Sequence, residues 1–535
     1  MAIPPDEILA YAATATGEDI PRTYAEAMSD TNAPLWRPPI AHEIRAHETN
    51  GTYDIINIED LPLSIRLVGT RWVFDAKKNE QGNIIKRKAR LVAQGFSQRP
   101  GVDYDDTYSP VMRYDSLRLI IWLSLYMNWI LRQMDFDAAY LNSMLKHIIY
   151  ARCPPGVGNP SVQALRLRKA LYGLKQSGRE WYDVLREWLR QLGFIAASFD
   201  PCVFINKDLV IGIYVDDVLM AGEPEAVTAF MTAAGQRFRM KDLGRPKLLL
   251  GLEFDYDDDV DGNRRRRIYL HQRTYINAVL RRYDMDKCNA RKTPLDPNHF
   301  PPRSDEPVDE ERQRRHQSIV GSINFLAIVS RPDLSYTVSM LGSYNANPSD
   351  QHVTLAAQVL RYLRGSVDFR IVINQDARSE VAMYTDASFG SDPDNAKSFS
   401  GYLMKLNGST VAWSSKRQSC VAKSTMEAEY MAASYAAAHL AWARQALIEL
   451  LDNVDHWQFK LLVDNQAAMS LIQDSKISAR SKHIAVHYHF VRERYHNNEF
   501  VIEHVASKDN LADLCTKALP LPLLTDLKSR IANGD

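Results

Sequence analysis

The stretch LVIGIYVDDVLMAGE, residues 209 to 223, places two adjacent carboxylates inside an otherwise apolar segment. Valine, isoleucine and leucine on both sides of the pair are typical of buried β-strands. Burying two like charges costs free energy unless cations or hydrogen bonds compensate them. A two-residue turn would let Asp216 and Asp217 project from the tip of a hairpin while the strands pack below. The segment therefore predicts a hairpin that carries carboxylates at its tip.

A second apolar strand pattern, WILRQMDF, also carries a carboxylate, Asp135. Other aspartate runs, at 105–106 and 257–259, lie in polar, turn-like surroundings where solvation accounts for them. Three convergent acids without a matching base stay ionised only where cations neutralise them. Hard divalent ions take oxygen ligands, and a pair of them about 3.5–4 Å apart serves phosphoryl transfer. Asp135, Asp216 and Asp217 are therefore candidate metal ligands.

The composition sets broad limits on the class of protein. A chain of 535 residues is too long for one core and suggests three or four domains. Lys plus Arg and Asp plus Glu are equal at 65 each, so net charge indicates no partner. The five cysteines lie far apart without a C-x-x-C pair, which favours an intracellular protein without disulfides or zinc. The sequence has no signal-peptide pattern and no apolar run near 18 residues, so we expect neither secretion nor membrane spanning.

Hydrophobic periodicity predicts alternating helices and strands along most of the chain. One strand is expected before NEQGN and one after it, because this stretch is a hairpin signal. Two amphipathic helices are expected within LRKALYGLKQSGREWYDVLREWLRQLG, residues 167–193, and a helical stretch at about 316–365. From about residue 380 the order is three strands, a long Ala-rich helix, a strand, a helix, a strand and a terminal helix. This order predicts a separate α/β unit.

Several motifs together resemble one family. YVDD on a hairpin, with QMDFDAAYLN upstream, resembles the palm of a reverse transcriptase. RWVFDAKKNEQGNIIKRKARLVAQGFSQRPGVDYDDTYSPVMR, LRKALYGLKQSGREWY, SINFLAIVSRPDLSYTV and VLRYLRG resemble, in the same order, the Pol polyprotein of copia-type (Pseudoviridae) LTR retrotransposons. The resemblance extends from about residue 23 to 520. It implies the reverse transcriptase plus ribonuclease H portion of that polyprotein.

The implied fold is α/β (α+β), with right-hand polymerase fingers, palm and thumb followed by a connection region and a ribonuclease H-like domain. The implied boundaries are a leader segment at 1–60, fingers and palm at 61–255, thumb and connection at 256–375, and the ribonuclease H-like domain at 376–535. Protease, integrase and Gag-type zinc motifs do not occur in the sequence. We therefore expect a C-terminal part of a polyprotein or a truncated genomic copy.

In the polymerase part, the resemblance makes Asp135 and Asp216 the shared metal ligands and Asp217 their companion. Tyr140 stands where the family has an aromatic steric gate that excludes a 2′-hydroxyl. The basic strand around KARLV would contact the incoming triphosphate, although a solvated strand face is the alternative. YGLKQS corresponds to the helix start that packs on the template base pair. The implied substrate-binding residues are Lys88, Arg90, Tyr140, Gly173, Lys175 and Gln176.

Four acids in the C-terminal part follow the order D–E–D–D on that strand and helix order and resemble a ribonuclease H. Each acid alone is more often a turn residue or a helix cap. Glu427 competes with Glu429 as the acid on the long helix, and a catalytic role for His504 stays open. The implied metal ligands are Asp386, Glu429, Asp464 and Asp513.

The resemblance implies an RNA-directed DNA polymerase with ribonuclease H activity that uses two Mg²⁺ ions, or Mn²⁺, in each active site. The expected substrates are deoxynucleoside triphosphates, an RNA template with a DNA or RNA primer, and RNA/DNA hybrids. The expected partners are Gag and integrase of the same element, with no membrane, in a cytoplasmic virus-like particle with a nuclear stage. The alternative is a decayed or domesticated copy that binds nucleic acid without catalysis. All seven acids are present, which favours an active enzyme.

Overall fold

The computed structural model describes residues 20–62, 65–78, 84–258, 266–297, 300–376, 378–474 and 486–533. The chain forms two compact units, each built from more than one stretch of sequence. The first unit takes residues up to Met112 and Ile130–Arg245, and the second takes Arg113–Trp129 and Pro246–Asp535. Both units mix helices and strands, so the predicted α/β (α+β) class is confirmed. The predicted boundaries at residues 60, 255 and 375 stay a prediction.

The N-terminal part of the first unit has small antiparallel sheets. Two strands pair on either side of NEQGN as predicted, with Asp75 opposite Lys88, while the predicted turn itself, residues 79–83, lies outside the described residues. Trp36 of the helix α3 packs edge-on against Phe74 of this hairpin, with ring centroids 5.1 Å apart. The elements are α2 (Tyr24–Ala27), α3 (Ala33–Asn50), the hairpin strands β2 (Thr70–Lys78) and β3 (Ile84–Ala93), and a sheet in the order β1 (Tyr53–Asn57), β6 (Gln163–Lys169), β5 (Met144–Arg152).

The main sheet of the first unit is antiparallel throughout. Trp181 and Phe238 both pack edge-on against Phe136 of the sheet, which fixes the helix α5 against it. The strands run in the order β11 (Met240–Gly244), β4 (Ile130–Phe136), β10 (Asp217–Gly222), β9 (Leu209–Tyr214), β8 (Val203–Asn206) and β7 (Ile195–Ala196). The helices are α5 (Ser177–Gln191) and α6 (Pro224–Arg237).

One of the two helices predicted within 167–193 is wrong. The second part is helical, as α5, but residues 167–169 belong to β6 and residues 170–176 form turns and irregular structure. Along β6, Leu165 and Leu167 are buried while Arg166 and Arg168 are exposed. This alternation has the period of two that is typical of a strand. The apolar run is too short for its pattern in the sequence to distinguish a strand from a helix.

The second unit begins with helix α4, which is mostly apolar and is buried from Ser116 to Leu125, the Arg118 side chain included. The predicted helical stretch near 316–365 is confirmed. A sheet in the order β12 (Leu248–Leu249), β13 (Leu252–Asp257), β14 (Arg267–His271), β15 (Ile371–Asn374) accompanies it. The helices of this part are α4 (Tyr114–Tyr126), α7 (Arg273–Arg282), α8 (Glu310–Val329), α9 (Ser335–Gly342) and α10 (Asp350–Gly365), with the short turn η4 (Pro332–Leu334).

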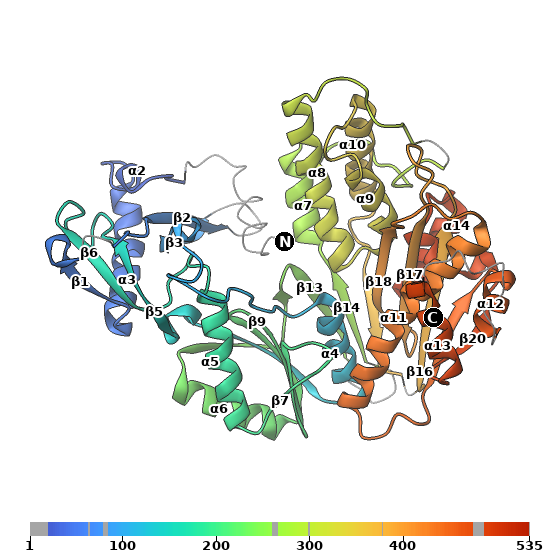
Figure 1. Cartoon of the computed structure of the whole chain (residues 1–535), viewed down its shortest axis with the longest axis horizontal. Coiled ribbons are helices and arrows are strands. Elements are labelled where there is room, and N and C mark those ends of the chain that lie inside the picture. Colours follow the sequence, from blue (N-terminus) through green and yellow to red (C-terminus); the bar gives the residue numbers. More distant parts are fainter. Residues whose placement is uncertain are drawn as a thin grey trace. The chain divides into compact units, whose positions relative to one another are not determined.

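The C-terminal part of the second unit is a mixed sheet with the long helix α11 beside it (Figure 1). Antiparallel pairing joins the first three strands in sequence, and parallel pairing joins the rest, as the predicted element order requires. The spatial order is β18 (Ser409–Arg417), β17 (Phe399–Leu406), β16 (Glu380–Ser388), β19 (Gln458–Val463), β20 (Val501–His504). The helices are α11 (Thr425–Leu450), α12 (Gln466–Gln473), α13 (Phe490–His496), the 3₁₀ segment η7 (Leu511–Cys515) and α14 (Leu521–Asn533).

Among the helices of the described ranges, none combines the length and the apolar character needed to cross a bilayer.

Candidate active sites

The predicted hairpin at residues 209–223 joins β9 to β10 through a turn at Val215 and Asp216. Tyr214 pairs with Asp217 across the turn. Val215 has φ 58°, a left-handed conformation that β-branched residues rarely adopt. Two contacts hold this turn. The Trp181 indole N–H donates to the Val215 carbonyl at 2.7 Å, and the Phe136 N–H donates to the Asp216 carbonyl at 2.9 Å. The surrounding structure therefore fixes a backbone conformation that the residue itself disfavours.

Strand β4 brings Asp135 to this hairpin, because Asp135 pairs directly with Asp217 in antiparallel register. Residues opposite each other in such a pair share one face of the sheet. We refer to Asp135, Asp216 and Asp217 as the hairpin acids. All of them are partly exposed, and their oxygen atoms are not gathered as tightly as those of the C-terminal acids described below.

Lys241 of β11 lies on the other side of Asp135, directly opposite it in the sheet. Its ammonium is 3.7 Å from the Asp135 carboxylate and also contacts Asp137. Asp137 and then Asp135 raise the pKa of Lys241. Sequence reasoning missed Lys241, since only the pairing of β11 with β4 brings the two residues together.

Tyr140 follows β4 and packs edge-on against Tyr172, with ring centroids 4.7 Å apart. The Arg90 guanidinium lies 5.9 Å from the Tyr172 ring centroid and 4.0 Å from the Asp75 carboxylate. Burial and then the charge of Asp216 raise the pKa of Tyr172. An aromatic pair and an arginine therefore lie near the hairpin acids, and the role of Tyr172 as support for Tyr140 was not predicted.

Gly173 has φ 87° and sits against the end of β3. A Cβ atom at Gly173 would lie 2.2 Å from the Ala93 carbonyl oxygen, and one at Gly95 would lie 2.2 Å from the Gly173 carbonyl oxygen. Any other residue at these two positions would force the strand and the segment apart. The glycines therefore allow the YGLKQS segment to pack closely against β3.

The rest of YGLKQS is tied to the loop that follows β3. Gln98 accepts from the Lys175 N–H at 2.9 Å and donates to the Gln176 side-chain oxygen at 3.0 Å. The Gln176 amide donates to the Asp103 carbonyl at 2.9 Å, and the Lys175 ammonium donates to Tyr104 at 3.2 Å. Gln176 is buried. Its side chain thus holds the loop in place, and the substrate-binding role that the resemblance implies for it stays a prediction.

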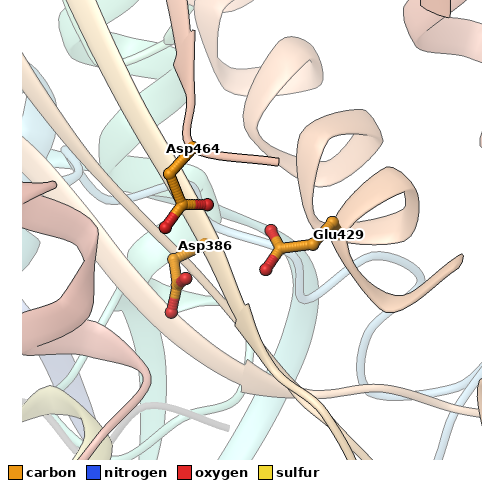
Figure 2. Close-up of side chains that lie close together, drawn as sticks. All are labelled: Asp386, Glu429 and Asp464. Atoms are coloured by element: carbon orange, nitrogen blue, oxygen red, sulfur yellow. The ribbon is translucent and has the colours of Figure 1, made fainter. Parts of the chain in front are cut away.

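In the second unit, three acids converge at one edge of the C-terminal sheet (Figure 2). Thr385 pairs with Val463 in parallel register, so the next residues of the two chains, Asp386 within β16 and Asp464 directly after β19, lie side by side. Glu429 reaches them from the first turns of α11. One carboxylate oxygen from each of these three residues lies within 4.8 Å of the other two. We name the three residues the buried acids; Asp386 and Glu429 are buried, and Asp464 is partly buried.

Burial and mutual repulsion act on these carboxylates. Asp386 is 1% exposed and Glu429 is 4% exposed. Burial, then Asp386 and Asp464, raise the pKa of Glu429 to about 9. Burial and Asp386 also raise the pKa of Asp464. The Glu429 Oε2 atom is buried without a hydrogen-bond partner among the described residues. An all-carboxylate donor set with an orphaned oxygen fits a hard divalent cation such as Mg²⁺ or Mn²⁺.

Asp513, on η7, joins the buried acids through a lysine. The Lys517 ammonium lies 2.8 Å from Asp513 Oδ1 and 3.0 Å from Asp386 Oδ1. The neighbouring Thr516 hydroxyl donates to the other Asp386 oxygen. Burial and Asp386 raise the pKa of Asp513 to about 7. Lys517 was not predicted, although its spacing of four residues from Asp513 was a readable signal for an ion pair.

The sequence left open whether Glu427 or Glu429 joins the other acids and whether His504 has a catalytic role. Glu427 accepts from the Lys423 N–H at 2.8 Å at the start of α11, and it does not join the buried acids. His504 ends β20 opposite Val463, with an exposed side chain. The structure thus brings Glu429, not Glu427, to the other acids.

Comparison with known proteins agrees with this architecture. Residues 50–297 match the family described as reverse transcriptase (RNA-dependent DNA polymerase). The chain is 33% identical to a retrovirus-related Pol polyprotein from transposon RE2 of Arabidopsis thaliana, over 96% of this chain and 35% of that protein. It is 31% identical to the one from transposon TNT 1-94 of Nicotiana tabacum, over 94% of this chain and 38% of that protein.

A solved structure of a foamy viral protease-reverse transcriptase in complex with double-stranded DNA aligns with 92% of this chain and 73% of its own, at 12% identity and a TM-score of 0.43. The chain spans a little over a third of the length of the curated relatives named above. The chain belongs to the copia-type retrotransposon Pol polyproteins and carries their reverse transcriptase region.

Proposed function

We propose that the chain is an RNA-directed DNA polymerase joined to a ribonuclease H of a copia-type retrotransposon. The observation that carries the proposal is the presence of two separate acid groups, one in each unit. The hairpin acids lie inside the reverse transcriptase family match, and the buried acids lie on a sheet and helix of ribonuclease H-like order. Each group has the oxygen ligands that nucleotidyl transfer or phosphodiester hydrolysis needs.

In the polymerase, Asp135 and Asp216 would hold Mg²⁺, with Asp217 beside them. Bound divalent ions supply charge neutralisation and a lower pKa for the attacking hydroxyl. Tyr140, backed by Tyr172, would exclude a ribose 2′-hydroxyl by contact with the sugar ring. Lys88 and Arg90 would bind the triphosphate oxygens, since both lie on the β2–β3 hairpin and Arg90 reaches the Tyr172 ring.

In the nuclease, Asp386, Glu429 and Asp464 would hold the cation that a water molecule needs to attack an RNA phosphodiester. Ser507 and Asn510 act against the rise in the pKa of Asp464 and so favour its ionised form. Asp386 and Glu429 are buried, which lowers the local dielectric constant and strengthens the attraction of their carboxylates for a cation.

The substrates we propose are deoxynucleoside triphosphates, an RNA template with a DNA or RNA primer, and the RNA strand of the resulting hybrid. Gag and integrase of the same element are the proposed partners. The proposed location is a cytoplasmic virus-like particle with a nuclear stage.

Primer extension on an RNA template and cleavage of an RNA/DNA hybrid test the two activities separately. We expect Asp216→Asn to abolish extension and keep cleavage, and Asp386→Asn to do the reverse. Equal extension by wild type and Asp216→Asn would refute the polymerase assignment. Cleavage that survives Asp386→Asn would refute the nuclease assignment. A wild-type chain that binds the hybrid but performs neither reaction would be the non-catalytic copy.

A further inference from the structure

The four acids of the second unit are not equivalent. Asp386 belongs to two groups: the buried acids, whose oxygen atoms converge with those of Glu429 and Asp464, and a pair with Asp513 that Lys517 holds together. The first group has three carboxylates and an orphaned oxygen, Glu429 Oε2. The second has two carboxylates with an ammonium placed between them. Lys517 therefore bonds both carboxylates of the second group directly, whereas it reaches the first group only through Asp386.

We propose that Lys517 is a built-in cation that holds the second cation position of this centre, so that a divalent ion enters there only by displacing it. The inference rests on the proposed nuclease and deepens it. The buried acids then form the primary divalent site, and Asp386 with Asp513 forms a secondary site whose occupant in the resting protein is the lysine ammonium.

The geometry gives the lysine the role that an ion would have. Its ammonium lies at hydrogen-bond distance, 2.8 and 3.0 Å, from one oxygen of each of two buried aspartates. Charge-assisted hydrogen bonds of this kind are about twice as strong as neutral ones. A divalent ion at the same place would have to break both bonds and move the ammonium away.

The backbone keeps the lysine in position. Lys517 stands four residues after Asp513, and its N–H donates to the Asp513 carbonyl at 3.1 Å, which continues the turn of η7. Thr516 occupies the remaining Asp386 oxygen with its hydroxyl. Asp386 thus receives two donors from this segment, whereas Glu429 Oε2 receives none among the described residues. The two divalent sites are therefore expected to fill in sequence, the buried acids first.

Mn²⁺ binding to the full-length chain tests the proposal without relying on turnover. The number of Mn²⁺ ions bound per chain is measured by titration with electron paramagnetic resonance detection of free Mn²⁺, for wild type, Lys517→Met and Lys517→Arg. We expect Lys517→Met to bind one more ion per chain than wild type at the same free Mn²⁺, and Lys517→Arg to bind the wild-type number. Ions held by the hairpin acids are common to all variants and cancel in the difference.

Lys460→Met is the matched control. Lys460 also bridges two carboxylates of the same sheet, 2.9 Å from Glu380 and 3.6 Å from Glu503, but lies away from the buried acids. Its removal should leave the Mn²⁺ count unchanged. Adding Asp513→Asn to Lys517→Met should remove the extra ion. If Lys517→Met does not fold, Lys517→Gln, which keeps a polar side chain, takes its place.

An unchanged Mn²⁺ count in the folded Lys517 variant would overturn the inference, and so would an equal gain in Lys460→Met. These outcomes are distinct from failure of the proposed function. A chain that cleaves hybrids but gains no ion refutes only the role of Lys517. A Lys517→Met chain that gains an ion while the wild type cleaves nothing refutes only the nuclease.

Discussion

In the second unit, the pKa of the buried carboxylate Asp333 and the pKa of Glu429, one of the buried acids, are shifted in opposite directions. Asp333, in η4, is 3% exposed, about as buried as Asp386 and Glu429. The Arg331 guanidinium donates to both Asp333 oxygens, at 2.9 and 2.8 Å, and the Lys528 ammonium lies 3.5 Å away. These cations outweigh burial and hold the pKa of Asp333 well below its usual range. Among the buried acids, burial and repulsion instead raise the pKa of Glu429 to about 9.

The difference lies in the supply of cations. Asp333 has an arginine, a lysine and a hydrogen bond from the Tyr362 hydroxyl at 2.5 Å. The buried acids and Asp513 share the single lysine Lys517 among the described residues. A buried carboxylate with its own cations is a structural element, whereas buried carboxylates short of cations form a binding site.

The largest expected change in the free energy of unfolding comes from breaking the ion pair of Asp333 with Arg331. Arg331→Met should lower the free energy of unfolding by about 3–5 kcal/mol, because it leaves the Asp333 charge buried without its main partner. Denaturant unfolding measures the change. Arg314→Met, which breaks an exposed pair with Glu310, is the control and should cost less than about 1 kcal/mol. Similar losses for the two variants would contradict the comparison.

The next largest expected effect is the stabilisation that Mg²⁺ gives by binding to the buried acids. Mg²⁺ at about 100 times its dissociation constant should stabilise the wild-type chain by about 2.7 kcal/mol, because the cation binds the folded buried acids and not the unfolded chain. Thermal unfolding with and without Mg²⁺ measures the shift. Glu429→Gln should lose most of it, and Arg331→Met should keep it. A full shift in Glu429→Gln would show that the ion binds elsewhere.

The pH dependence should also separate the two groups. Glu429 has a folded pKa of about 9 against an ordinary value of 4.5, so between these values the folded state binds more protons than the unfolded state. Stability without divalent ions should therefore fall as pH rises from about 4.5 to 9, by at most about 1.4 kcal/mol per pH unit from this group. Glu429→Gln should flatten this slope in EDTA.

Asp333 should give the opposite sign. Its folded pKa is lowered, so its contribution is fully present above the ordinary value of 3.8 and is lost only as pH falls further. Unfolding of wild type and Glu429→Gln at a series of pH values measures the slope between pH 4.5 and 9, which comes from Glu429, and the loss of stability below pH 3.8, which comes from Asp333. An equal slope in both chains above pH 4.5 would contradict the assignment to Glu429.

The smallest expected effect concerns the hairpin acids. Asp216→Asn should change the free energy of unfolding by less than about 0.5 kcal/mol, because Asp216 is partly exposed and water solvates its charge. The same variant should keep the Mg²⁺ stabilisation of the buried acids. Thermal unfolding checks both, with Glu429→Gln as the contrasting variant. A large loss of stability in Asp216→Asn would mean that the hairpin acids are structural.

The sequence predicted elements whose signals are local. The apolar residues around Asp216 indicated the hairpin. The competition between Glu427 and Glu429 stayed open in the sequence, and only the fold places Glu429 beside Asp386 and Asp464. The contacts of Lys241 and Tyr172 come from strand pairing and tertiary packing, which no local pattern reveals. The spacing of Lys517 indicates its pair with Asp513, but its contact with Asp386 depends on the tertiary fold. Arg331 stands only two residues before Asp333, but no local pattern shows that this pair is buried or that Lys528 of α14 also reaches it. The short β6 resembled a helix because its apolar run was brief.

Helix α4 has a practical consequence for dividing the chain into fragments. Arg118 of α4 donates to the Val411 carbonyl at 2.5 Å and lies 3.9 Å from the Trp413 ring centroid, so the helix is part of the second unit although it interrupts the first in sequence. A fragment that ends at residue 245 would keep this apolar helix without its covering strand, and a fragment that starts at 246 would lack it. Neither half can be expressed by a single cut without uncovering a hydrophobic surface, so activity assays require both halves together.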